Sequence, residues 1–313
     1  MLTHLASLTL IFIISLTLLP TARAHGYVAQ VTIDGTLYVG NVPNASPTPS
    51  IVRQINNVAP VKGANNSNLN CGQDAQKAAL VASANPGSKL TFSWKGGDGS
   101  DWPHNIGPIM TYMTPCLNTT CDQYDSTNAM WFKVDEVGLE SGNSTWYQQN
   151  LMNGYPANVT IPETLEPGEY LIRHEIIALH LANEMGGAEF YPSCTQVQVK
   201  GSQTGGPLAN ETVTFPGGYS DTAPGIYDPN IFNTPLDNYV FPGPPIAQFV
   251  LDSSGSSSNS SSSSSPSPTS SSPVPLPSST GSGAGNASCK LRVQSMNVQR
   301  PRSVSRIMRD LLF

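Results

Sequence analysis

The sequence predicts an all-β protein, an antiparallel β-sandwich of the immunoglobulin or fibronectin kind with long loops and short helices. Apolar and polar residues alternate over residues 90–94 and again over residues 195–199, as in strands with one buried face. Charged residues make up only 12% of the 313 residues, whereas Gly and Pro contribute 27 each. This composition favours short strands and many turns over long charged helices.

Two further strands are expected at residues 157–161 and 170–179, and turn sequences such as Asn-Pro-Gly at residues 85–87 separate the strands. Helical periodicity is brief and is strongest over residues 73–82. Together these segments favour a single sandwich domain over residues 25–252.

Residues 1–24 are expected to form a signal peptide. Their apolar stretch, residues 8–19, is too short to span the roughly 30 Å core of a bilayer, and Ala22-Arg23-Ala24 fits a cleavage site. Cleavage after Ala24 would make His25 the first residue of a secreted, extracellular protein. No other segment is long and apolar enough to be a membrane helix, so we expect no membrane partner.

The C-terminal part is predicted to be a linker followed by a tail. Residues 253–288 contain 19 Ser among 36 residues and no charge, a composition that cannot bury enough apolar area to fold. Residues 289–313 form a basic tail to which we assign no role. Residues 25–251 hold 8 Lys and Arg against 19 Asp and Glu, a net charge of −11. This acidic body argues against nucleic acid as a partner, because nucleic-acid affinity comes largely from basic contacts to phosphates.

Export predicts disulfide bonds, since four of the five cysteines lie in the predicted domain. Four cysteines allow three connectivities. The short spacing of Cys116 and Cys121 favours a small closed loop, which would leave Cys71–Cys194 as a long-range bond and Cys289 as an odd thiol in the tail. Sequons typical of a glycosylated extracellular surface begin at Asn65, Asn118, Asn143, Asn158 and Asn210.

A histidine at a processed N-terminus is chemically unusual. The α-amine has a reference pKa of about 7.7 to 8.0, so the amine and ring of His25 together can chelate a metal at modest deprotonation cost. One further imidazole would complete a three-nitrogen set of the kind that selects Cu(II). His104 lies in a turn-rich loop, Trp-Pro-His-Asn-Ile-Gly-Pro at residues 102–108, and is the candidate for that second imidazole.

The combination of His25-Gly-Tyr-Val, the His104 loop and the segments 173–180 and 187–194 resembles the fungal lytic polysaccharide monooxygenases of auxiliary activity family nine. The resemblance runs from residue 25 to about residue 250. It implies one copper ion held by the amine and ring of His25, by His104 and by an axial Tyr191. His180 matches the histidine that hydrogen-bonds reactive oxygen in the family, and its usual Gln partner is Glu189 here.

The same resemblance implies oxidative cleavage of a β-1,4-glucan, most of all insoluble cellulose, by hydroxylation at C1 and/or C4. The co-substrate would be O2 or H2O2, and the electron donor a small molecule or a flavocytochrome. Three tyrosines match family positions on the flat face that lies on the polysaccharide. These are Tyr27, Tyr227 and Tyr239. Tyrosine suits such a face because its ring stacks on sugar rings while its hydroxyl stays in contact with water. We expect a monomer.

Two other classes of protein agree less well with the sequence. A glycoside hydrolase needs two carboxylates that flank the bond, and no spacing pairs Glu163, Glu175 or Glu189. A non-catalytic copper- or glycan-binding protein on the same fold is the main alternative, which the presence of His180 and Tyr191 argues against. His174 begins a zinc-protease motif that fails at Ala178, so we interpret His174 as structural.

Overall fold

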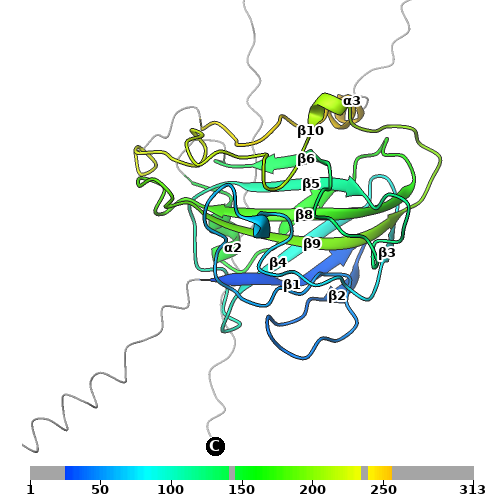
Figure 1. The fold of residues 1–313 in the computed structure, drawn as a ribbon, viewed down its shortest axis with the longest axis horizontal. Helices are drawn as coiled ribbons and strands as arrows, with labels where there is room; N and C mark the ends of the chain where they lie inside the picture. The colour runs from blue at the N-terminus through cyan, green and yellow to red at the C-terminus, as the bar shows by residue number, and fades with distance from the viewer. Residues whose placement is uncertain (1–24, 141–144, 234–238, 256–313) are drawn as a thin grey trace, which may run out of the picture. The chain divides into compact units, whose positions relative to one another are not determined.

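The structure, a computed structural model, describes residues 25–140, 145–233 and 239–255, and it confirms the predicted β-sandwich (Figure 1). One sheet has four strands in the order β2-β1-β4-β7, and the other has six in the order β10-β6-β5-β8-β9-β3. Among the described strands every pairing is antiparallel except that of β3 with β9. The strands are β1 (Gly26–Ile33), β2 (Thr36–Val39), β3 (Ala82–Ala84), β4 (Lys89–Gly96), β5 (Ile109–Pro115), β6 (Trp131–Val137), β7 (Ala157–Thr160), β8 (Gly168–Ala178), β9 (Glu189–Val199) and β10 (Thr212–Val213).

The main core lies between the two sheets. In β4 the predicted alternation places Leu90, Phe92 and Trp94 on the buried face, with intermediate residues between them. They pack with inward residues of the six-stranded sheet such as Ile172 and Ile176 of β8. Because side chains alternate between the two faces of a strand, each of these strands gives every second residue to this core.

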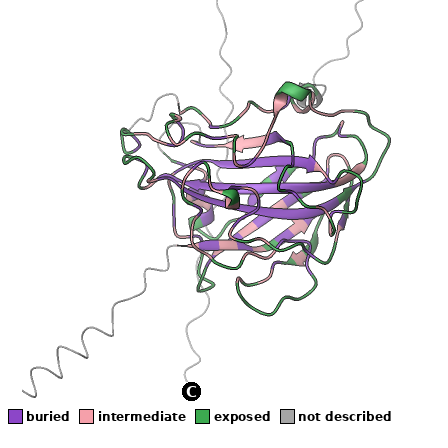
Figure 2. Cartoon of the chain, viewed as in Figure 1, coloured by how far each residue is buried: buried purple, intermediate pink, exposed green. Residues whose placement is uncertain are grey.

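The central strands of the six-stranded sheet are buried on both faces. Figure 2 shows β8 and β9 buried almost from end to end, and the burial pattern agrees along both strands. Leu171, Ile177 and Phe190 point away from the sandwich interior into a second apolar cluster, which includes loop residues such as Leu69 and Phe215. Burial on both faces explains why residues 170–179 carry apolar side chains at both even and odd positions on either side of the buried Arg173-His174-Glu175, rather than a clean alternation.

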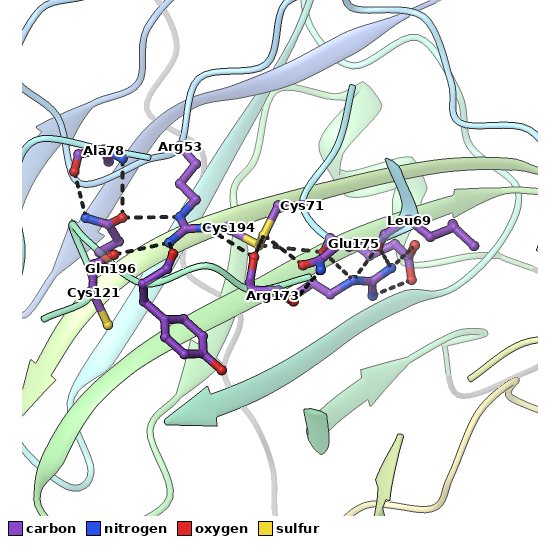
Figure 3. The surroundings of a disulfide bond; sticks show 12 residues. Arg53, Leu69, Cys71, Ala78, Cys121, Arg173, Glu175, Cys194 and Gln196 are labelled. Atoms are coloured by element: carbon purple, nitrogen blue, oxygen red, sulfur yellow. Dashed lines mark hydrogen bonds and ion pairs between the residues drawn. A yellow bond between two sulfur atoms is a disulfide. The ribbon is translucent and has the colours of Figure 1, made fainter. Parts of the chain in front are cut away.

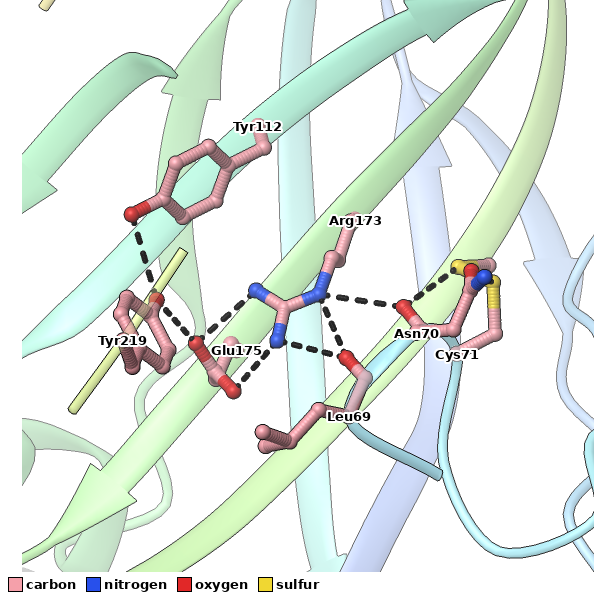
Figure 4. Close-up of polar contacts among 8 residues, drawn as sticks. Leu69, Asn70, Cys71, Tyr112, Arg173, Glu175 and Tyr219 are labelled. Carbon is pink, nitrogen blue, oxygen red and sulfur yellow. Dashed lines mark hydrogen bonds and ion pairs between the residues drawn. A yellow bond between two sulfur atoms is a disulfide. The ribbon is translucent and has the colours of Figure 1, made fainter. Parts of the chain in front are cut away.

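A buried ion pair connects β8 to the loops that cover the outer face of the large sheet, such as those around Leu69 and Phe215, which we call the loop layer (Figure 4). The guanidinium of Arg173 donates to both oxygens of Glu175, at 2.9 and 2.6 Å, and to the carbonyl of Leu69, at 2.9 and 2.7 Å. The hydroxyl of Tyr219 donates to Glu175 at 2.6 Å. Arg173 also lies 3.8 Å above the ring of Phe215. Each buried charge therefore has several partners, as burial of charge requires.

The disulfides join Cys71 to Cys194 and Cys116 to Cys121. Figure 3 shows the first of these bonds between β9 and the loop around residue 71, next to Arg173. A bond across 123 residues ties the loop layer to the centre of the large sheet, whereas the second bond closes a short loop of five-residue separation.

The helical periodicity of residues 73–82 does not correspond to a helix in the structure. The side chain of Gln196 in β9 forms hydrogen bonds with the backbone of Ala78 at 3.2 and 3.0 Å (Figure 3). It also donates to the carbonyl of Leu80 at 2.8 Å, while the Leu80 amide donates to the Ser50 carbonyl. Since these backbone groups have partners distant in sequence, the segment runs extended and enters β3. Tertiary hydrogen bonds override the weak local propensity here.

The helices are short, as predicted: α2 (Gln148–Met152), α3 (Gln248–Gly255) and the 3-10 turns η1 (Ser67–Leu69) and η2 (Ala209–Glu211). In the described part of the chain, no helix has the length and apolar character to cross a membrane. Helix α3 continues three residues past the predicted domain boundary at 252. The predicted signal peptide, the tail and the rest of the linker lie outside the described residues.

Candidate active site

His25 is held by the first strand pair. It precedes β1, and its carbonyl accepts a 2.7 Å hydrogen bond from the amide of Gly97 at the end of β4. Next to it, Gly26 lies so close to the Lys95 carbonyl that a Cβ there would collide with it. Glycine therefore permits the close approach that places His25 at the end of the sandwich.

His104 is positioned by a tightly packed loop between β4 and β5. Trp102 is fully buried, and its ring makes edge-on contacts with His104 at 5.4 Å and with Tyr191 at 4.9 Å between ring centres. Further along the loop, Gly107 has a φ of 122°, and a Cβ there would collide with the Ile177 carbonyl. The loop is thus pressed onto the end of β8, and only glycine fits at residue 107.

The connection between β8 and β9 supplies three more side chains. His180 follows the end of β8, and Glu189 and Tyr191 share one face at the start of β9. The rings of His104 and His180 stack 4.1 Å apart with an interplanar angle of 12°. Oε2 of Glu189 lies 3.7 Å from Nε2 of His104 and 3.8 Å from Nε2 of His180, and it accepts a 2.8 Å hydrogen bond from the Tyr191 hydroxyl.

Burial shifts the pKa of two groups in this cluster, Tyr191 and His180. Desolvation raises the pKa of Tyr191 well above its usual value, and the nearby Glu189 carboxylate raises it further, so Tyr191 stays a neutral phenol. Desolvation lowers the pKa of His180, although Glu189 opposes that shift. A neutral imidazole keeps a lone pair for a metal or a hydrogen bond. Lys62 lies 3.7 Å from the other oxygen of Glu189 and partly compensates its charge.

His25, His104 and Tyr191 fit a copper ion as a donor set. The ring centre of Tyr191 is 6.5 Å from that of His25 and 6.3 Å from that of His104, so one phenol faces both imidazoles at nearly equal distance. Two imidazoles and an amine are nitrogen donors of the kind that Cu(II) prefers. A second combination also meets metal-ligand spacing, because donor atoms of His104, His180 and Glu189 all lie within 4.8 Å of one another.

The three tyrosines predicted to contact substrate lie in different surroundings. Tyr27 is half-buried in β1 and pairs with Lys95 of β4. Tyr227 is half-buried in a loop whose next residue, Asp228, donates its amide to Ala182 in the β8–β9 connection. Tyr239 packs edge-on against Trp146 at 4.9 Å, and its hydroxyl donates to the Gly225 carbonyl at 2.8 Å. Tyr239 thus has packing contacts within the loop layer.

His174 lies in the core between the sheets. Its ring stacks on Phe92 at 4.1 Å, and its Nδ1 accepts a 3.2 Å hydrogen bond from the indole of Trp94. Complete burial lowers the pKa of His174 to about 3. A neutral core histidine matches the structural role expected from the sequence.

Sequence reasoning missed several residues that hold the site. Gln148 of α2 is fully buried, accepts a 3.3 Å hydrogen bond from the Trp102 indole and donates at 2.9 Å to the Ile177 carbonyl. Trp102 stands two residues before His104 in the same motif, and this proximity is the one sequence signal that could have pointed to it. Gln148 and Lys62 gave no local signal, since they reach the site only through the fold.

The predicted glycosylation sites are at the surface where the structure describes them. Asn65, Asn118, Asn158 and Asn210 are exposed, as a glycan acceptor must be. Asn143 lies outside the described residues.

Fold and site together define a class of protein, a β-sandwich metalloenzyme with a cluster of imidazole, phenol and carboxylate groups at one end. The chain belongs to Auxiliary Activity family 9 (formerly GH61), whose family model matches residues 25–239. Members of this family are copper-dependent enzymes that oxidise polysaccharides, and the chain is accordingly a copper oxidoreductase.

Individual relatives agree with the family match. The chain is 55% identical over 242 residues to AA9 family lytic polysaccharide monooxygenase D of Gloeophyllum trabeum, which covers 77% of this chain and 70% of that protein. It is 41% identical over 250 residues to monooxygenase A of the same fungus, which covers 75% of each.

Solved structures show the same fold. The extended catalytic domain of LPMO9A from H. jecorina aligns with a TM-score of 0.65 at 33% identity, over 72% of this chain and 91% of that one. A cellulose-active polysaccharide monooxygenase from M. thermophila aligns with a TM-score of 0.63 at 35% identity, over 71% of this chain and 98% of that one.

Proposed function

We propose that this protein cleaves cellulose oxidatively, by hydroxylation at C1 and/or C4 of the β-1,4-linked glucose units. One copper ion would be held by the amine and ring of His25, by the ring of His104 and by the hydroxyl of Tyr191. The observation that carries the proposal is the meeting of these three rings at the end of the sandwich, with Tyr191 nearly equidistant from both imidazoles.

The substrate is proposed from two supports. One structural neighbour, at 35% identity, is described as cellulose-active. In addition, half-buried Tyr27 adjoins Gly26 and His25 and offers a ring that can stack on a sugar face. Tyr227, beside the β8–β9 connection, would extend this contact. Tyr239 would contribute chiefly by shaping the loop in which it packs.

Copper bound at this position would supply the one-electron chemistry that lets O2 or H2O2 oxidise a C–H bond. With O2, insertion of one oxygen atom needs two electrons and two protons from outside the substrate and releases one water. The hydroxylated carbon then expels the glycosidic oxygen, which breaks the chain. The electrons would come from a small reductant or a flavocytochrome.

The chain's own residues would manage the protons. Glu189 can carry a proton on Oε2, which faces both His104 and His180. His180 is 28% exposed and can exchange protons with water, so the pair His180–Glu189 offers a route between solvent and the reaction site. The hydrogen of the Tyr191 hydroxyl is engaged by Glu189, and the phenol oxygen keeps its acceptor capacity.

The proposal requires processing of the N-terminus. Cleavage after Ala24 would release the amine of His25 and deliver the protein outside the cell. There the protein would act as a monomer. We expect Cu(II) to bind at least tenfold more weakly when one residue is added before His25, because the amine then becomes an amide. Copper titration and electron paramagnetic resonance on the two forms test this, and equal binding would contradict the proposed ligand set.

Activity is tested on cellulose with and without a reductant. Mass spectrometry is expected to find aldonic acids from C1 oxidation, or 4-keto sugars from C4 oxidation, only when both copper and reductant are present. If all the released oligosaccharides are unoxidised, the result would contradict the oxygenase proposal. Copper binding without any cleavage would point instead to a copper- or glycan-binding protein on the same fold.

A further inference from the structure

A second set of ligating groups overlaps the proposed copper site without using the N-terminus. Donor atoms of His104, His180 and Glu189 lie within 4.8 Å of one another, and the three residues come from two separate parts of the chain. We propose that these three side chains form a binding site for Zn²⁺ that competes with the copper set for His104. The site itself depends only on these side chains and does not rest on the proposed function.

The distances are close to those of a zinc site. Zinc–ligand bonds of about 2.0 to 2.1 Å in a tetrahedron separate neighbouring donor atoms by about 3.3 Å. Oε2 of Glu189 lies 3.7 and 3.8 Å from the two Nε2 atoms, so contraction by about half an ångström per pair would bring the carboxylate to bonding distance. Two imidazoles, one carboxylate and an open fourth position form a common zinc set.

One ring must tilt for both imidazoles to ligate. The His104 and His180 rings are almost parallel, with an interplanar angle of 12°, and parallel rings do not aim both lone pairs at one point. His104 is fixed against Trp102, whereas the side chain of His180 is 28% exposed and follows the end of β8. His180 is therefore the ligand that moves on binding.

The surroundings prepare the carboxylate for this role. The Tyr191 hydroxyl donates to Oε2 at 2.8 Å and orients it, as groups around a metal ligand commonly do. Lys62 lies 3.7 Å from Oε1, so the two oxygens of Glu189 have different partners. The carboxylate is also the decisive chemical feature, because an ionised oxygen binds Zn²⁺ far better than a neutral amide of the same shape.

Competition follows from the shared ligand. Nε2 of His104 can bind one ion at a time, so zinc at the second site would withdraw His104 from the copper set. If the proposed function holds, Zn²⁺ would slow copper loading of the wild-type protein. Glu189→Gln should remove this effect while it leaves the three proposed nitrogen ligands of copper in place.

The direct test is calorimetric titration with zinc chloride. It uses the full secreted chain from residue 25 in four forms: wild type, Glu189→Gln, Glu184→Gln and His25→Ala. Glu184 is an exposed carboxylate of the same β8–β9 connection and serves as the matched control. We expect zinc affinity to fall at least tenfold in Glu189→Gln and to stay within threefold of wild type in Glu184→Gln and His25→Ala.

Two titration results would overturn the zinc site. One is equal zinc affinity in wild type and Glu189→Gln, and the other is loss of zinc binding in His25→Ala, which would place zinc in the copper set. Thermal melting of each variant without metal shows that the folds are intact. Co²⁺, used as a visible-absorbing substitute, should give a spectrum that changes in His180→Ala, and an unchanged spectrum would also count against the site.

A separate copper titration keeps the two proposals apart. His25→Ala should lose copper affinity and keep zinc affinity if both hold. If His25→Ala keeps both its copper and its zinc affinity, the copper ligand set is refuted and the zinc site stands. If His25→Ala loses both affinities, the zinc site is refuted and the copper ligand set stands.

Discussion

The hydroxyl of Tyr191 donates a 2.8 Å hydrogen bond to the carboxylate of Glu189, which lies two residues earlier on the same face of β9. Residues i and i+2 of a strand share a face, so this bond is built into the strand rather than into a loop. Both side chains are buried, with relative exposures of 3% and 7%. Each is therefore a main partner that keeps the other's polar group satisfied.

We expect Tyr191→Phe to lower the free energy of unfolding by about 1 to 2 kcal/mol, because the buried carboxylate loses its nearest donor. Urea unfolding monitored by tryptophan fluorescence measures the change. Tyr155→Phe is the control, since Tyr155 is 65% exposed and should shift stability by less than about 0.5 kcal/mol. Equal unfolding midpoints for wild type and Tyr191→Phe would show that the hydrogen bond carries no stability.

His174 should make the protein sensitive to acid. Burial lowers its pKa from 6.5 to about 3, so below pH 6.5 the unfolded chain binds a proton that the folded chain refuses. The stability contributed by the neutral ring is complete above pH 6.5 and is lost as the pH falls toward 3. At pH 4.5 the loss from this group is about 3 kcal/mol, at 1.36 kcal/mol per pH unit.

The variant His174→Gln tests this prediction, because glutamine can accept the Trp94 indole hydrogen bond but does not titrate. Free energies of unfolding are measured at pH 7 and pH 4.5 for both proteins. Acidic groups lose the same stability in each, so the difference isolates His174. The prediction fails if wild type and variant lose equal stability between the two pH values.

The fold was predictable where burial leaves a local pattern. Residues 90–94 alternate because one face of β4 meets the core and the other does not. The periodicity of residues 73–82 was a poor guide to their structure, because their backbone binds Gln196 and Ser50, which are distant in the sequence. Helix α2 gave no signal in the sequence, because it is little longer than one turn. Its contribution to the site comes from the buried side chain of Gln148.

The candidate site was predictable from residue types more than from positions. His25, His104 and Tyr191 stand in short motifs with distinctive neighbours, and the structure brings them together. Tyr239 stands in an equally distinctive motif, but its ring packs on Trp146. Sequence shows that an aromatic residue is present, whereas its exposure depends on loops that pack across more than ninety residues of chain.

The buried pair Arg173–Glu175 should be costly to break and cheaper to replace. Arg173→Met leaves a fully buried carboxylate without its main partner, and we expect a loss of about 3 to 5 kcal/mol in the free energy of unfolding. The double variant Arg173→Met, Glu175→Met should lose less than the single variant, because no buried charge remains. Chemical unfolding of the wild type, Arg173→Met and the double variant measures the two losses.

The exposed pair Lys95–Asp101 is the control for this cycle. It is equally short at 2.6 Å, but its side chains are 36% and 46% exposed. Lys95→Met should therefore cost less than about 1 kcal/mol, since water screens the remaining charge. If the double variant at residues 173 and 175 is as unstable as Arg173→Met alone, the cost lies in packing against Phe215 and Tyr219 rather than in the unpaired charge.

Gln148 should position the proposed copper ligands His104 and Tyr191 through Trp102. Its amide accepts from the Trp102 indole and donates to the Ile177 carbonyl, so Gln148→Leu leaves two buried polar groups unsatisfied at about 1 to 3 kcal/mol each. Trp102 contacts both His104 and Tyr191, so a displaced indole should also weaken copper binding several-fold and alter the copper paramagnetic resonance spectrum. Gln198→Leu, at an exposed position near the far end of β9, is the control and should leave affinity and spectrum unchanged. A Gln148→Leu protein that is less stable yet binds copper with the wild-type spectrum would limit Gln148 to a structural role, because a displaced Trp102 cannot leave both neighbouring ligands undisturbed.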